Sequence, residues 1–300
     1  MSNAVGHDPD GEIEASRAPL LDHLIELRMR LIICVVAIAL AFGVCFAFVK
    51  PIFLFLVRPF TVAEGLKAMQ DAGGEHGAFD LLLALVGVKK VATGALANIT
   101  LQATAPLEQF FTNIKLAAFG GIILAFPVIA WQLYRFVAPG LYRKERNAFL
   151  PFLIASPVLF LMGASLVYYV MLPFVLWFSL SQQMVGDGVQ VVLQTRVSEY
   201  LTLVTTLLLA FGLSFQLPVV LSLGGLAGLV TSQMLRTGRR YAIVAVFVVA
   251  AIVTPPDPIS QITLAVPLCL LYEISIWCVW LIERRRKEED EKAGTDLVAS

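Results

Sequence analysis

The sequence predicts an all-α integral membrane protein with six transmembrane helices, both termini in the cytoplasm and the last two helices short. Hydrophobic residues occupy 58% of the 300 positions, and the mean hydropathy is +0.82. Charged residues occupy only 15%, whereas they make up about a quarter of a typical soluble domain. Long apolar runs alternate with short basic segments, which is the pattern of a multi-spanning membrane protein.

The chain before the first apolar run is polar. Residues 1–18 are expected to form a disordered cytoplasmic tail, without the basic and short apolar regions of a cleaved signal peptide. In residues 19–30, leucines at helical spacing predict an amphipathic helix that lies on the membrane surface before the chain turns into the bilayer. The uncharged run 31–49 is long enough for the first span.

A long external loop is expected from residue 50 to about residue 112. Within it, the apolar run 79–88 is too short to span and predicts an interfacial helix, while 98–105 alternates weakly and favours an extended segment. The second span lies between Lys115 and Arg135, with Lys115 near its outer end.

Residues 147–186 carry no charge and contain three prolines, so the third span is placed at about 149–172, with the chain continuing to about 183. A short external loop follows, and the fourth span covers about 200–223. The next apolar runs, 241–253 and 259–282, are brief or interrupted, and the proline-rich segment between them predicts a tight hairpin. The hairpin either crosses a thinned bilayer or re-enters it, and in both cases the chain returns to the side it left.

Basic residues set the expected orientation. Fifteen of the 22 lysines and arginines fall on one side of the predicted topology, and positive charge marks the cytoplasmic side. The other seven lie mostly in the long first external loop, where the rule is weak. The fifteen are Arg17, Arg28, Arg30, Arg135, Arg143, Lys144, Arg146, Arg236, Arg239, Arg240, Arg284, Arg285, Arg286, Lys287 and Lys292.

Four segments occur in an order that resembles the TatC family, the multi-spanning subunit of the twin-arginine protein translocase. They are His23-Leu-Ile-Glu-Leu-Arg28, Phe136-Val-Ala-Pro-Gly-Leu-Tyr142 with Glu145-Arg146, Ala210-Phe-Gly-Leu-Ser-Phe-Gln-Leu-Pro218, and Thr254-Pro-Pro-Asp257 with Ser260-Gln261. The resemblance covers residues 19–282, with 62–95 as a periplasmic insertion, and leaves 283–300 as a charged cytoplasmic tail. It implies a receptor in the bacterial inner membrane. Such a receptor binds twin-arginine signal peptides of folded cargo, associates with itself and with the single-span subunits TatA and TatB, and depends on the proton-motive force.

The resemblance also implies a signal-peptide site. Glu26 and Glu145 are its acidic contacts, because a carboxylate binds a guanidinium through two parallel hydrogen bonds. Arg28 and Arg143 keep these carboxylates ionised, and Phe136 is the aromatic residue of the same loop. The alternative is that both glutamates simply form ion pairs with the neighbouring arginines.

Four polar residues within or between the last three spans are candidates for contacts inside the membrane or with partner helices: Gln216, Thr254, Gln261 and Glu273. The family pattern has Glu at the first of these positions. Gln216 cannot titrate, so a proton-carrying role is in doubt, whereas hydrogen bonding to a partner helix or local thinning of the membrane remains open. The alternative is an amide satisfied by backbone groups that Pro218 frees.

Other functional classes find less support in the sequence. A small-molecule or ion transporter would require polar groups that converge at mid-membrane, often from an internal repeat, and no repeat is found. No nucleotide-binding, metal-binding or catalytic motif occurs, and all four cysteines lie within apolar runs. We therefore expect no enzyme activity, no catalytic residues, no metal, no cofactor and no nucleic-acid partner.

Overall fold

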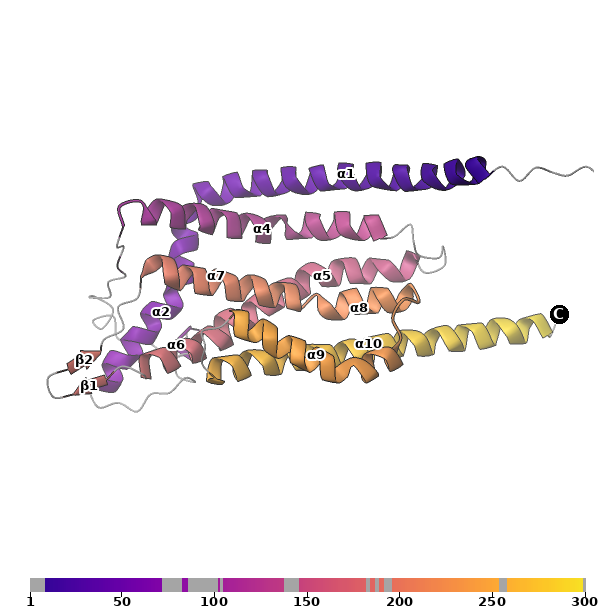
Figure 1. Ribbon diagram of the computed structural model, residues 1–300. Helices are drawn as coiled ribbons and strands as arrows, with labels where there is room; N and C mark the ends of the chain where they lie inside the picture. The colour runs from indigo at the N-terminus through magenta and orange to yellow at the C-terminus, as the bar shows by residue number, and fades with distance from the viewer. Residues whose placement is uncertain are drawn as a thin grey trace, which may run out of the picture.

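The structure is a computed structural model that describes part of the 300-residue chain. Its described residues form a bundle of long helices that lie roughly side by side, with a small β-hairpin at one end (Figure 1). The described residues are 9–71, 83–85, 102, 105–137, 146–181, 184–186, 189–191, 196–253 and 258–298.

Helix α1 (Pro9–Ala47) packs antiparallel to α4 (Glu108–Val137) along one side of the bundle (Figure 1). Glycine permits the close approach, because a Cβ at Gly121 would lie 3.0 Å from the backbone of Phe42. The prediction that the chain turns near residue 31 is wrong, since α1 continues without a break. No glycine or proline occurs between residues 20 and 42 to interrupt it. The helix also begins at Pro9, inside the stretch expected to be a disordered tail.

Helix α2 (Val49–Asp71) occupies the start of the segment predicted to be a loop, so that prediction is wrong for these residues. Pro51 falls in the first turn of α2, where its missing N–H removes no helical hydrogen bond. Pro59 lies inside the helix and leaves the carbonyl of Phe55 without its helical donor. The hydroxyl of Tyr168 donates to that carbonyl at 2.8 Å, so a distant side chain satisfies the proline break.

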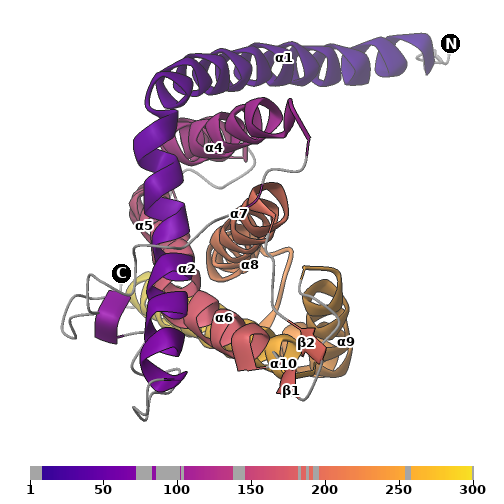
Figure 2. The same ribbon diagram turned by 90° about the vertical axis from the view of Figure 1, so that its left-hand side faces the viewer.

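Helix α2 crosses the end of the bundle from α1 and α4 toward α6, as Figure 2 shows. The hydroxyl of Tyr200 donates to the carbonyl of Leu56 at 2.9 Å, and its ring packs against Phe60 with centroids 5.2 Å apart. Leu56 and Phe60 are both almost fully buried. Buried hydrogen bonds and aromatic contacts therefore anchor α2 as a cap on this end of the bundle.

The rest of the predicted external loop is described only in part. Residues 83–85 are helical and fall within the interfacial helix expected at 79–88. Gln102, from the segment expected to be extended, forms an isolated parallel bridge with Arg196. The other residues between 72 and 104 lie outside the described residues.

The third apolar run forms one continuous helical path. It consists of α5 (Arg146–Leu166), a π-helical turn η3 (Val167–Met171) and α6 (Leu172–Ser181). Pro173 explains the π-helical turn η3, because in a regular α-helix the proline ring would clash with the carbonyl four residues earlier. The N–H of Leu172 instead bonds to the carbonyl of Val167, five residues back.

A short antiparallel hairpin follows α6 at the α2 end of the bundle (Figure 1). Strand β1 (Met184–Gly186) pairs with β2 (Val189–Val191), with Val185 opposite Gln190. The sequence predicted only a short external loop here.

Helices α7 (Val197–Ser214) and α8 (Leu217–Leu226) form the fourth predicted span, broken at Phe215 and Gln216. Pro218 causes the break, since it lacks the N–H that would bond to Ser214. Helix α7 packs closely against α5. A Cβ at Gly212 would lie 2.6 Å from the ring of Phe160, so only glycine fits at this contact.

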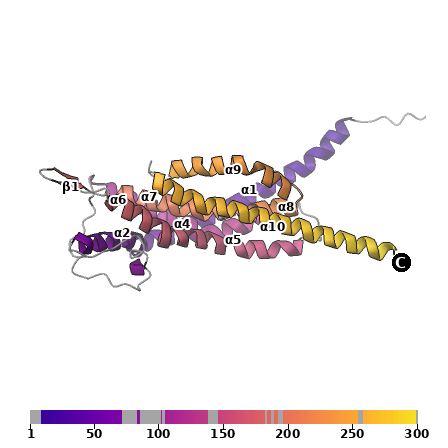
Figure 3. The same ribbon diagram turned by 90° about the horizontal axis from the view of Figure 1, so that it is seen from below.

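Helix α9 (Ser232–Val253) and helix α10 (Pro258–Val298) run antiparallel and in contact, and α10 also packs against α8 (Figures 1 and 3). Gly228 has a φ of +71°, which suits glycine at the end of α8. The N–H of Leu229 bonds to the carbonyl of Gly224 at 2.9 Å, and this closes α8 before the chain reverses into α9.

Five stretches of the described chain are long and apolar enough to cross a membrane, so the prediction of a multi-spanning helical membrane protein is confirmed. They are Ile25–Ala47, Glu108–Phe136, Phe152–Ser181, Val197–Leu226 and Gln261–Glu288. Helix α9 is not among them, because three arginines occupy its first half.

The contact between α5 and α7 generates a stability prediction. Replacing Gly212 with Leu should lower the free energy of unfolding by about 1–3 kcal/mol, since the added side chain meets the ring of Phe160. The measurement is the thermal unfolding midpoint of the detergent-solubilised protein. Gly43→Leu is the matched control, because a Cβ at Gly43 meets nothing within 4 Å. Equal midpoints for the two variants would contradict the proposed close packing.

Candidate functional site at the basic end of the bundle

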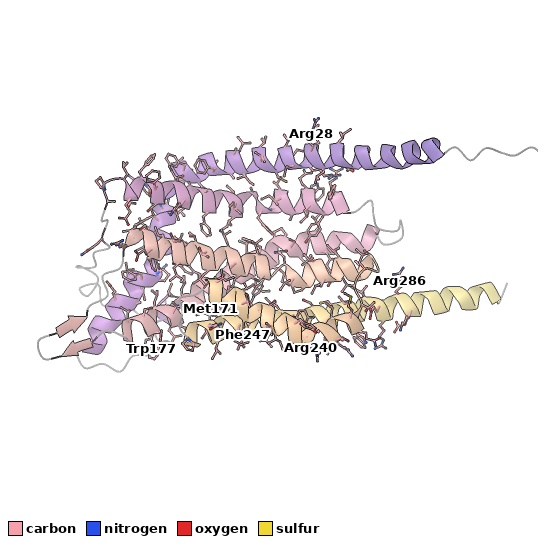
Figure 4. All side chains as sticks on the ribbon, viewed as in Figure 1. Arg28, Met171, Trp177, Arg240, Phe247 and Arg286 are labelled. Atoms are coloured by element: carbon pink, nitrogen blue, oxygen red, sulfur yellow. The ribbon has the colours of Figure 1, made fainter. Side chains whose placement is uncertain are left out.

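The basic segments separated in sequence meet at one end of the bundle, opposite the end capped by α2. In Figure 1, the N-terminal part of α1, the end of α4, the start of α5 and the turn from α8 to α9 all lie toward this end. Arg28, Arg240 and Arg286 lie in this half of the bundle in Figure 4, on three different helices. We call this region the basic end.

Glu26 lies on α1 and is partly exposed, with 38% of its side chain accessible. It forms an ion pair one helical turn away with Arg30, whose Nε lies 3.2 Å from its Oε1. Arg30 is only 16% exposed, so it is the more buried partner. Glu26 therefore forms an ion pair within its own helix, and Arg30 is its partner.

Arg28 is exposed and points away from the bundle in Figure 4. It stands on α1 above the last turns of α4, the helix that leads into the second recognition segment. Phe136 lies in the last turn of α4 and is partly buried. Arg143 and Glu145 lie outside the described residues, but α4 and α5 hold both ends of the segment that contains them at the basic end.

Gln216 lies in the break between α7 and α8 and forms two hydrogen bonds with one residue of α5. The hydroxyl of Ser156 donates to Oε1 of Gln216 at 2.6 Å, and Nε2 of Gln216 donates to the carbonyl of Ser156 at 3.0 Å. Tyr134 on α4 shares a side-chain hydrogen bond with Ser156. The three residues link α4, α5 and the α7–α8 break, and the hydroxyl and backbone carbonyl of Ser156 satisfy the amide of Gln216, rather than the backbone groups that Pro218 frees.

Glu273 on α10 accepts a hydrogen bond from Arg239 on α9, with Nη2 and Oε2 2.7 Å apart. Both side chains are about half exposed. The hydroxyl of Tyr272 also donates to the carbonyl of Leu235 on α9, at 2.8 Å. An ionisable residue within an apolar helix was identified from the sequence, but its partner was not, because the two residues are far apart in sequence.

Gln261 and Thr254 are the other candidate residues of the α9–α10 hairpin, and the structure describes only the first. Nε2 of Gln261 donates to the carbonyl of Phe247 at 3.2 Å, so this side chain joins α10 to α9 within the chain. Thr254 lies outside the described residues.

Glu283 was not identified from the sequence as an important residue. Its carboxylate accepts the backbone N–H of Ser232 at 2.9 Å and the hydroxyl of Ser232 at 2.5 Å. A carboxylate at a helix N-terminus satisfies backbone donors and complements the helix dipole. Glu283 therefore fixes the start of α9 to α10, and only the proximity of the two helices in space reveals this role.

The described residues offer no cluster of three or more His, Cys, Asp or Glu side chains that could hold a metal ion. The polar groups of the basic end are instead arranged as a charged surface, with carboxylates set among arginines on several helices.

Comparison with known proteins identifies the family. A sequence profile described as Sec-independent protein translocase protein (TatC) matches residues 22–267. The chain belongs to the TatC family. The Magnetococcus marinus protein named Sec-independent protein translocase protein TatC is 42% identical over 91% of this chain and 88% of its own length. The Aquifex aeolicus protein of the same name is 37% identical over 90% of this chain and 98% of its own length.

Solved structures agree with this assignment. The crystal structure described as the twin-arginine translocase receptor TatC is 35% identical and covers 86% of this chain and 98% of its own, with a TM-score of 0.65. As a TatC protein, this chain is a membrane subunit of a protein translocase and not an enzyme. None of these comparisons supports the small-molecule transporter alternative.

The hydrogen bonds of Gln216 generate a second prediction. Ser156→Ala removes the donor to Oε1 of Gln216 and should destabilise the protein by about 1 kcal/mol, the usual size of a hydrogen bond between membrane helices. Chemical or thermal unfolding in detergent measures the change. Ser165→Ala on the same helical path is the matched control, because Ser165 is exposed. A loss no greater than that of the control would contradict the role assigned to Ser156.

Proposed function

We propose that this TatC protein is the receptor for twin-arginine signal peptides, and that the signal binds at the basic end. Glu26 and Glu145 accept the paired guanidinium groups, while Arg28 and Arg143 keep the carboxylates ionised and Phe136 contributes an aromatic contact. The observation that carries the proposal is the position of Glu26. It lies on α1, which packs along α4, and α4 leads into the segment that contains Glu145.

The contact between Glu26 and Arg30 is compatible with ligand binding. An ion pair one turn apart on a helix contributes only about 0.3–0.5 kcal/mol. A guanidinium that reaches a carboxylate with both donors forms a stronger charge-assisted pair. A signal-peptide arginine can therefore replace Arg30 at small cost, and Arg30 holds the carboxylate in place until the ligand arrives.

Six spans with both termini in the cytoplasm complete the proposed topology. Helix α9 supplies the remaining span, the fifth in chain order, a short one whose apolar part begins after Arg240 and which crosses a locally thinned bilayer beside α10. Both ends of the described chain lie toward the basic end in Figures 1 and 3, which supports an even number of crossings. The excess of positive charge at that end supports its cytoplasmic location in the inner membrane.

The α9–α10 hairpin is the proposed contact for the single-span subunits TatA and TatB. Its outer face is apolar and exposed, with Val244, Val248 and Ile252 on α9. Thr254, Gln261 and Glu273 are its polar groups, and Gln216 contributes from the α7–α8 break. Because Gln216 cannot titrate, the proton-motive force acts through a different group. The same proposal includes self-association of the receptor and folded proteins as its cargo. It also divides the chain into a cytoplasmic tail of residues 1–18, a membrane domain of residues 19–282 with a periplasmic insertion at 62–95, and a charged cytoplasmic tail of residues 283–300.

Signal-peptide affinity tests the site directly. Glu26→Gln and Glu145→Gln should each weaken binding of a twin-arginine peptide about tenfold or more, since a hydrogen bond to a charged group contributes about 1.5–3 kcal/mol. The measurement is the dissociation constant of a fluorescent signal peptide for the protein in vesicles. Glu199→Gln, at the α2 end of the bundle, should leave the affinity unchanged. Wild-type affinity in both site variants, with normal insertion, would overturn the assignment.

A further inference from the structure

An apolar pocket of about 620 Å³ lies beside the α2 cap, away from the basic end and from the α9–α10 hairpin. Its walls come from the end of α1, the start of α2, the middle of α4 and the path from α5 into η3. Its volume falls within the range of about 300–1,000 Å³ that is typical of small-molecule sites. Neither the proposed signal-peptide site nor the partner contact uses it.

The pocket opens toward the surroundings of the bundle. Phe55, Leu124 and Leu161 line it and are each more than half exposed, whereas Leu56 and Phe119 on its inner side are buried. Three of these helices, α1, α4 and α5, belong to candidate membrane spans. The opening therefore faces lipid, and an apolar occupant enters from the bilayer.

Cations surround the outer edge of the pocket. Lys50 is adjacent to the lining residue Pro51, and Lys115 lies one helical turn beyond Phe119 toward the α2 end. Arg58 lies one helical turn after the lining residue Phe55 on α2. All three side chains are exposed, and none forms an ion pair with another described residue.

The dimensions favour a lipid chain over a protein helix. On α4 the lining runs from Phe119 to Leu124, which is about 8 Å along a helix at 1.5 Å per residue. A transmembrane helix would require a groove of about 30 Å, the thickness of the hydrocarbon core. The pocket thus accommodates the part of an acyl chain nearest its headgroup, with positive charge at the level of the phosphate.

We propose that this pocket binds one acyl chain of an anionic glycerophospholipid from the leaflet at the α2 end, with Lys50, Arg58 and Lys115 contacting its phosphate headgroup. The acyl chain fills the pocket beside α2, and the headgroup neutralises cations that have no carboxylate partner among the described residues. This inference goes beyond the proposed receptor function, and it relies on that proposal only to name the leaflet as periplasmic.

Photo-crosslinking with lipids tests the proposal. The full-length protein is reconstituted in phosphatidylcholine vesicles that contain a trace of phosphatidylglycerol with a diazirine in its acyl chain, or the same probe with a phosphocholine headgroup. Crosslinked peptides are mapped by mass spectrometry. We expect labelling concentrated at residues 119–124 and 161–169, with an excess of at least about fivefold for the anionic probe, since a single basic residue near a membrane surface contributes roughly this factor.

Two kinds of variant separate the chain site from the headgroup contact. Ala164→Trp narrows the pocket wall and Ser165→Trp narrows its opening, so each should reduce labelling by both probes severalfold. The triple variant Lys50→Gln/Arg58→Gln/Lys115→Gln should abolish the preference for the anionic probe while labelling by the neutral probe continues. Val36→Trp, on the exposed face of α1, is the control and should change neither result.

Three results of the lipid experiment would overturn the proposal. They are equal labelling by the two probes, labelling spread evenly over exposed positions of α1, and unchanged labelling in both tryptophan variants. A benzoylphenylalanine at Leu161 that crosslinks to a protein subunit or to a signal peptide in native membranes would also overturn it. Signal-peptide affinity is measured in the same vesicles, so loss of the lipid contact with normal affinity is distinguishable from failure of the receptor proposal.

Discussion

The contact between α5 and the broken α7–α8 helix is the interaction on which the rest of the structure depends. Gly163 and Gly212 bring the two helices so close that any Cβ would meet an aromatic ring or a carbonyl of the other helix. Phe160 fills the space beside Gly212 and stacks on Phe126 of α4, with ring centroids 4.1 Å apart. Small residues allow such contacts in lipid, where apolar burial does not favour association between helices.

Polar groups determine how α2 and α8 are held against the contact between α5 and α7. Ser156 and Gln216 hold the helix break against α5, and from the break α8 continues to its contact with α10. At the other end, Tyr168 and Tyr200 bind carbonyls of α2 next to Pro59. The helix breaks at Pro59 and Pro218 have the same explanation, because a backbone or side-chain polar group inside the bundle must find a partner within the protein. The result is a bundle with a capped end and a charged end.

The sequence was sufficient to predict the apolar helices, the basic segments between them and the family, because length, hydropathy and motif order are local properties. It was misleading for α2, which was predicted to be the start of a long external loop, and the tyrosine that satisfies the carbonyl of Phe55 is 113 positions away. It identified Glu273 and Gln216 as unusual polar residues, but Arg239 and Ser156 become visible as partners only when the helices are packed. Glu283 looked like part of a charged tail for the same reason.

The central claim is that this protein recognises paired arginines at the basic end. Site-specific photo-crosslinking tests it most directly, with a photoreactive residue at position 26 or 145 and a radiolabelled precursor in native membranes. The precursor carries either its Arg-Arg signal or the same signal with Lys-Lys, which keeps the charge but loses the planar two-donor geometry. We expect crosslinks from both positions that require Arg-Arg. Equal crosslinks to the two signals, or none from a properly inserted protein, would contradict the account.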